Sequence, residues 1–119
     1  MKIKAFKIDV ENKKIEKIEI EPTLSCIYFH IGCRSVDVLR PYEFNTDIVY
    51  IDDEGLFNNE PGAFSIRGMY GIFQGNGLVV GTTSDGEDSN ITIAIEKLQE
   101  LVKFEDPHYL PEPRFLFID

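Results

Sequence analysis

The stretch IVYIDDEGLFNNEPGAFSIRGMYGIFQGNGLVVGT, residues 48–82, decides the fold. It begins with the apolar run 48–51 and ends with the run 78–80, and both runs are typical of fully buried strands. Six glycines lie between them, and glycine is favoured where the backbone takes a positive φ or passes close to another segment. We therefore expect two core strands around a loop-rich excursion, and any functional site should lie in that excursion.

The segments before this stretch predict further strands and a short helix. Residues 1–10 alternate apolar and charged side chains, and residues 15–20 continue after a polar turn, which indicates an N-terminal β-hairpin. Residues 24–31 carry apolar side chains at helical spacing, with a proline before them and a glycine after them, which favours a short helix. Residues 35–40 alternate again and predict another strand.

A longer helix is expected after the central stretch. The apolar residues of 91–102 recur at helical spacing, and Ser89 or Asn90 is a suitable N-cap. The predicted fold class is therefore α+β, with a mainly antiparallel sheet of five or six strands on which one short and one longer helix pack.

The length of 119 residues indicates one domain, which we expect to span residues 1–105. Residues 106–119 form a different segment, because three prolines within it prevent a helix and favour extended structure. The apolar run 115–118 near its end needs burial. We expect this tail to pack on the body of its own chain or on a neighbour, which leaves a homodimer through the tail open.

The net charge of −9 is concentrated in the centre of the chain, where residues 41–90 carry nine acids and a single base. This excess of negative charge disfavours direct binding to nucleic-acid phosphates. It remains compatible with a cationic partner, a metal ion or simple solubility.

No apolar run is long enough for a membrane span, and the first ten residues do not resemble a signal peptide. Cys26 and Cys33 lack metal-binding partners at standard spacing, and we interpret them as reduced, buried thiols. Together these features predict a cytoplasmic protein.

The densest acidic cluster is Asp52-Asp53-Glu54, and it does not fit the spacing of a calcium-binding loop. A structural turn explains it better than acid–base chemistry. Arg67 is the only base of residues 41–90; it could clamp an anion, although an ion pair with a neighbouring acid is the simpler interpretation. With Asn76, these residues are the candidate interaction surface.

The sequence contains no phosphate-binding loop, dinucleotide fingerprint or nucleophile elbow. His30 and His108 have no nearby nucleophile at a recognisable spacing, and His30 suits a structural position near a helix C-terminus. We therefore expect no catalytic residue, no metal and no cofactor.

Residues 27–104 resemble a small domain of unknown function carried by phages, plasmids and conjugative elements. The similarity rests on glycine and apolar positions and on an acidic strand-turn, namely Gly32, Val36, the segment 50–56 (YIDDEGL), Asn58-Asn59, Gly75, the segment 77–81 (GLVVG) and residues 98–104. The resemblance implies an accessory protein of a mobile element or of its bacterial host, and it implies no chemistry.

The leading hypothesis is a non-catalytic protein-interaction module that uses the acidic, glycine-rich surface. One alternative is a nucleic-acid mimic, which requires the acids of residues 43–60 and 85–88 to form one surface. Another is a small metal-dependent hydrolase that uses Asp52, Asp53 and Glu54 with a histidine. A protein that sequesters a nucleotide under the glycine-rich loop is disfavoured by the local negative charge.

Overall fold

The computed structural model describes residues 1–55 and 60–107. Its strands are β1 (Ile3–Asp9), β2 (Lys14–Ile20), β3 (Val36–Leu39), β4 (Ile48–Asp52), β5 (Ala63–Ile66), β6 (Phe73–Gln74), β7 (Gly77–Thr82), β8 (Asp88–Ser89) and β9 (Val102–Glu105). Its helices are α1 (Leu24–Ile31), the 3-10 turn η1 (Tyr42–Phe44) and α2 (Ile95–Leu101). The predicted packing of the tail concerns residues 108–119, which lie outside the described residues, and it stays a prediction.

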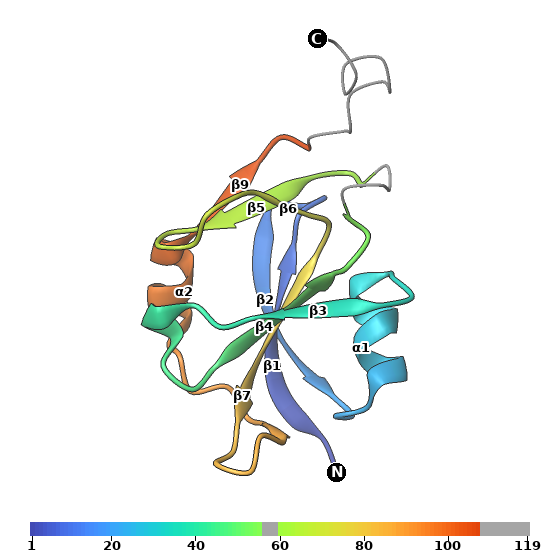
Figure 1. Cartoon of the computed structure of the whole chain (residues 1–119), viewed down its shortest axis with the longest axis vertical. Helices are drawn as coiled ribbons and strands as arrows, with labels where there is room; N and C mark the ends of the chain where they lie inside the picture. Colours follow the sequence, from blue (N-terminus) through green and yellow to red (C-terminus); the bar gives the residue numbers. More distant parts are fainter. Residues whose placement is uncertain (56–59, 108–119) are drawn as a thin grey trace, which may run out of the picture.

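The main sheet has the strand order β2-β1-β7-β4-β3, and β8 pairs with β7 to give six strands (Figure 1). All of its pairings are antiparallel. The N-terminal hairpin forms in the predicted place, with Ile3 opposite Ile20. The α+β class, with a mainly antiparallel six-stranded sheet and two helices, is therefore confirmed.

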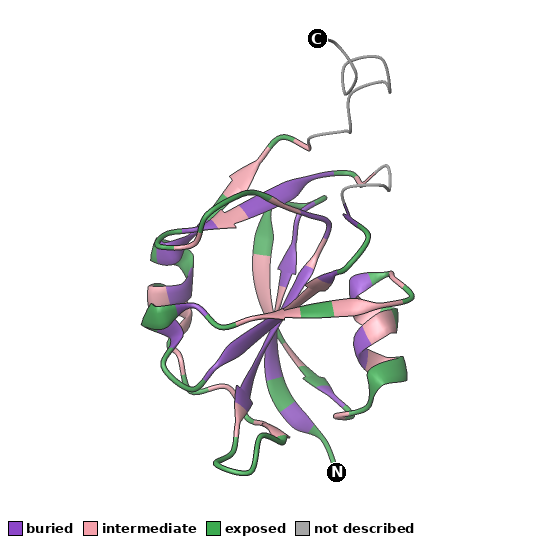
Figure 2. Cartoon of the chain, viewed as in Figure 1, coloured by how far each residue is buried: buried purple, intermediate pink, exposed green. Residues whose placement is uncertain are grey.

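Both faces of this sheet are covered, which explains why its central strands read as continuous apolar runs. Leu78 and Val80 of β7 belong to a core cluster that includes residues of α1. Val79, between them, points to the opposite face and joins a second cluster with residues of β5 and α2. Figure 2 shows buried residues along β4 and β7 of the main sheet and along β5 of the other sheet.

Helix α1 begins and ends as its sequence predicts. The Thr23 side chain accepts a hydrogen bond from the backbone N–H of Cys26 at 3.3 Å, which caps the first turn. Gly32 ends the helix with a φ of 82°, and its N–H donates to the Tyr28 carbonyl at 2.7 Å.

A second sheet, with the order β6-β5-β9, was not predicted. Strands β5 and β6 lie inside the glycine-rich excursion that we expected to be mainly loop. Strand β9 pairs Ile66 with Val102 and Ala63 with Glu105, so Val102 begins a strand rather than continuing the preceding helix. This sheet covers the side of the main sheet that faces away from α1.

The late helix starts later than predicted, at Ile95, and its N-cap is Ala94 rather than Ser89 or Asn90. The reason is that the preceding residues make other hydrogen bonds. The Asn90 side chain accepts from the Lys4 backbone N–H at 2.8 Å, and the Ile91 N–H donates to the Lys4 carbonyl at 3.0 Å. These bonds attach the segment to β1 and keep it out of the helix.

Candidate functional site

The acidic turn after β4 is a structural turn whose side chains are engaged with neighbouring segments. Asp52 is 6% exposed, and its carboxylate accepts the Glu54 backbone N–H at 2.8 Å. Asp53 is exposed and accepts the Ser35 hydroxyl at 2.9 Å, while its own N–H donates to the Ser35 carbonyl at 3.1 Å. Glu54 lies 3.8 Å from Arg34. Of the three acids in this turn, Asp53 and Glu54 present their carboxylates at the surface and Asp52 does not.

Asp52 also forms a carboxyl pair with Glu60, which is half-buried. Burial is the main cause that raises the pKa of Glu60 to about 7, and a hydrogen bond with Asp52 and its negative charge add to it. Burial likewise raises the pKa of the Cys33 thiol to about 11, assisted by the charge of Asp52. A thiol with that pKa stays protonated at neutral pH and is a poor nucleophile.

The two cysteines are free, and both are half-buried rather than fully buried as expected. His30 is half-buried on α1, with its ring edge-on to Phe29 at 5.4 Å. Burial, followed by the positive charge of Lys7, lowers the pKa of His30. Among residues 1–55 and 60–107, no group of three or more His, Cys, Asp or Glu side chains is placed to hold a metal ion. His108 lies outside the described residues.

Asn76, a member of the candidate interaction surface, is half-buried and makes a structural contact. Its side-chain oxygen accepts the Val10 backbone N–H at 3.0 Å, which joins the turn before β7 to the end of β1. Its neighbour Gly75 has a φ of 87°, which favours glycine, and it lies against the Glu60 carboxylate, so a Cβ there would displace the Glu60 side chain.

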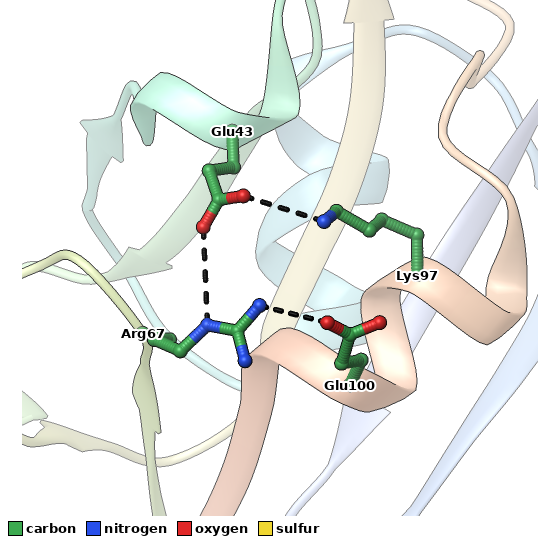
Figure 3. Close-up of polar contacts among 4 residues, drawn as sticks. All are labelled: Glu43, Arg67, Lys97 and Glu100. Carbon is green, nitrogen blue, oxygen red and sulfur yellow. Dashed lines mark hydrogen bonds and ion pairs between the residues drawn. The ribbon is translucent and has the colours of Figure 1, made fainter.

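Arg67 lies apart from the acidic turn. It follows β5, whereas Glu60, which pairs with Asp52 of that turn, precedes the same strand. Its guanidinium binds the Glu100 carboxylate at 2.8 Å and lies 3.9 Å from Glu43 (Figure 3). Glu43 in turn lies 3.3 Å from the Lys97 ammonium. The predicted ion pair of Arg67 with a neighbouring acid is thus confirmed, and it links η1, the turn after β5 and α2.

Two exposed tyrosines lie within three residues, along the chain, of members of this ion-pair network, and no sequence pattern marks them. Tyr42 is 95% exposed and Tyr70 is 101% exposed. Tyr42 directly precedes Glu43, and Tyr70 is three residues after Arg67, so they lie in the two segments that the Glu43–Arg67 pair joins. We call Tyr42, Arg67 and Tyr70 the tyrosine–arginine surface. Tyrosine occurs both buried and exposed, so residue type alone does not reveal which tyrosines face solvent. This surface was not predicted from the sequence for that reason.

The second acidic cluster does not join the first. Strand β7 pairs Gly77 with Ile51, so its first residue is close to the acidic turn, whereas its last residue Thr82 pairs with Asp88. Residues 85–88 therefore lie near the other end of β7, roughly 17 Å along the strand from Gly77, and the Asp88 carboxylate accepts the Tyr50 hydroxyl at 2.7 Å. The continuous row of carboxylates that a nucleic-acid mimic requires is not formed by these two clusters.

Open grooves lie on the described part of the molecule. One groove, of about 520 Å³, lies between β1 and β2 on one side and the segment before α2 on the other, and its charged lining residues are Lys4, Lys17 and Glu96. A second groove of about 370 Å³ lies between β2 and β9. Neither groove contains a nucleophile beside a base, which is the arrangement that covalent catalysis needs.

The fold and these sites define a small two-sheet α+β domain whose polar residues serve mainly structural contacts. A protein-family model described as "Domain of unknown function (DUF3846)" matches residues 2–103. The chain therefore belongs to this family. No curated protein and no solved structure matches it. Within the described residues, neither helix has the length and apolar character that a transmembrane helix requires.

Proposed function

We propose that this domain is a non-catalytic protein-interaction module of a mobile genetic element or its bacterial host, acting in the cytoplasm. The proposal rests on the tyrosine–arginine surface: two almost fully exposed tyrosines stand in the two segments that the Glu43–Arg67 ion pair joins, and Arg67 also binds Glu100. The genetic context rests on the resemblance of residues 27–104 to domains of mobile elements. The family match identifies a domain of unknown function and names no carrier.

The composition of this surface favours protein binding on physical grounds. Tyrosine and arginine are enriched among the residues that contribute most to protein–protein affinity. A tyrosine offers a large contact area and orders only two torsion angles, so its entropic cost on binding is small. Glu43 and Glu100 pair with the Arg67 guanidinium before a partner arrives, which restricts its side chain and lowers the cost of association.

The contact surface is therefore proposed at the Arg67 end of β5 rather than at the acidic turn. Asp52 is too buried to contact a partner, and Asn76 binds the backbone of Val10. Asp53 and Glu54 remain exposed and serve as the competing location.

A pull-down from bacterial lysate tests this proposal with two matched variants. The first is Tyr42→Ser with Tyr70→Ser, and the second is Asp53→Ala with Glu54→Ala. These exposed side chains contribute little to folding, so both variants should keep the wild-type melting temperature. We expect the tyrosine variant to lose the captured partner, with the affinity for the purified partner falling at least about tenfold.

The acidic-turn variant should retain the partner at wild-type affinity. Loss of the partner in that variant alone would move the contact surface to Asp53 and Glu54. Capture that is unchanged in both variants, or a turnover activity towards the captured molecule, would contradict the proposed function.

A further inference from the structure

The groove between β2 and β9 is lined by residues from two strand edges and α2. Its lining residues are Lys13, Lys14, Ile15, Gln99, Val102 and Phe104, around a volume of about 370 Å³. Ile15 and Phe104 both pack against the core cluster between the two sheets. The groove therefore opens at the margin of that core, where the two sheets come together.

Both strands that flank the groove have an edge without a strand partner in the described part of the chain. Strand β2 pairs with β1 alone, and β9 pairs with β5 alone, within residues 1–55 and 60–107. A strand edge carries backbone N–H and C=O groups that favour pairing with another extended segment. Two such edges around a groove with an apolar side, formed by Ile15, Val102 and Phe104, suit the addition of a β-strand.

We propose that residues 115–118 of the same chain occupy this groove as a strand, antiparallel to β9. The connection 106–114 contains the three prolines, which do not suit a paired strand, so pairing can begin only after Pro113. Nine residues are enough for the chain to reverse direction, and the cost of closing such a loop is modest. The run FLFI has four residues, the same number as β9.

The chemistry of this segment matches the groove. All four residues are large and apolar, so either register places two apolar side chains towards Ile15 and Phe104. Asp119 follows the segment, and the exposed lysines Lys13 and Lys14 lie at the groove. The chain's own segment is favoured over a second copy, because it is attached to β9 and so has a high effective concentration at this groove.

A disulfide trap in the full chain tests the proposal. In a Cys26→Ser, Cys33→Ser background, Ile15→Cys is combined with Leu116→Cys or with Phe117→Cys, which covers both strand registers. The matched control places the β2 cysteine at Glu16, whose side chain points to the opposite face of the sheet. Under mild oxidation in dilute solution, we expect one Ile15 pair to form an intramolecular disulfide at least about tenfold faster than its Glu16 control.

Equal rates for the Ile15 and Glu16 pairs would overturn the proposal. Disulfides that form only between chains would also overturn it, because the occupant would then be a second copy. Hydrogen exchange gives an independent readout without cysteines. Replacing residues 115–118 by serine should lower the protection of the β9 amides at least about tenfold, and unchanged protection would contradict the inference.

This inference does not depend on the tyrosine–arginine surface, which lies at the turn after β5 and on η1. The disulfide and exchange experiments read the fold of the chain alone. Their outcome is therefore independent of whether the partner pull-down succeeds.

Discussion

Asp47 is the most buried carboxylate among the described residues, at 1% exposure, and it holds the segment that precedes α2. Its two oxygens accept hydrogen bonds from the Thr92 N–H, the Thr92 hydroxyl and the Ile93 N–H, each at 2.8 Å. This anchor explains why residues 92 and 93 are not helical although their apolar neighbours follow helical spacing. No local pattern marks Asp47, because its partners are 45 and 46 residues away.

The substitution Asp47→Ala should lower the free energy of unfolding by about 2–4 kcal/mol, because it leaves three donors without their acceptor. Urea unfolding measures this change. The matched control is Asp53→Ala, which removes one exposed hydrogen bond from Ser35 and should cost less than about 1 kcal/mol. Similar losses for the two variants would show that Asp47 has no special anchoring role.

Glu60 makes stability depend on pH in a direction opposite to an ordinary surface carboxylate. Its pKa is raised to about 7 in the folded chain from the ordinary value of 4.5, so between these pH values the folded state retains a proton that the unfolded state releases. Stability is therefore highest below pH 4.5 as far as this group is concerned, and it is lost as the pH rises to 7.

The variant Glu60→Gln should remove this loss, because glutamine stays neutral and can still hydrogen-bond Asp52. Since solvent screens a half-buried group, we expect the gain over wild type at pH 8 to be only about 1 kcal/mol, and near zero at pH 4. Thermal melts across this range make the comparison. If the melting temperatures of the wild type and the variant differ by the same amount at every pH, the raised pKa of Glu60 is wrong.

At the scale of elements, the sequence predicts those whose pattern is local. The β1–β2 hairpin alternates within each strand, α1 has its cap residues on both sides, and β4 and β7 are continuous apolar runs. The second sheet is different, because β5 pairs with β9, which lies 36 positions later for the Ile66–Val102 pair. Val102 also lies four residues after Leu98, so helical spacing hides the start of β9.

The candidate site was predicted only in part for the same reason. The turn character of residues 52–54 and the ion pairing of Arg67 follow from residue type. Whether Asp52 is buried, and whether Asn76 faces solvent, depends on the neighbours β1 and β6 that tertiary structure supplies. The separation of Arg67 from the acidic turn likewise follows from β5, a strand that the glycines around it conceal.

Gly81 shows how closely two elements approach where β7 meets the segment after β8. A Cβ at this position would collide with the backbone carbonyl oxygen of Asn90. Gly86, in the preceding turn, has a φ of 84° but open space around it. Substitutions at Gly81 and Gly86 therefore distinguish the energetic cost of crowding from the cost of a positive φ.

We expect Gly81→Ala to lower the free energy of unfolding by about 3 kcal/mol or more, because backbone atoms must move apart. Gly86→Ala should cost about 1 kcal/mol through backbone strain alone. Chemical denaturation of both variants gives the two values. A smaller loss for Gly81→Ala than for Gly86→Ala would mean that β7 and the Asn90 segment are not in close contact.

At the scale of the whole molecule, the main sheet separates two apolar cores and also couples them. Ile27 of α1 packs in one core and Leu98 of α2 packs in the other, with exposures of 1% and 0%. Strand β7 contributes to both cores through alternate side chains, so neither core can be lost without disturbing a strand that the other needs. This arrangement predicts a single cooperative unfolding transition.

The variants Ile27→Ala and Leu98→Ala test this coupling. Each should lower the free energy of unfolding by about 2–5 kcal/mol, because each leaves a cavity in a packed core. Since the two side chains do not touch and lie on opposite faces of the sheet, their costs should add within about 0.5 kcal/mol in the double variant. Denaturation followed by both near-UV and far-UV circular dichroism should give coincident curves. Two separate transitions, or one variant that melts α1 while the second sheet stays protected from exchange, would show that the two cores are independent folding units.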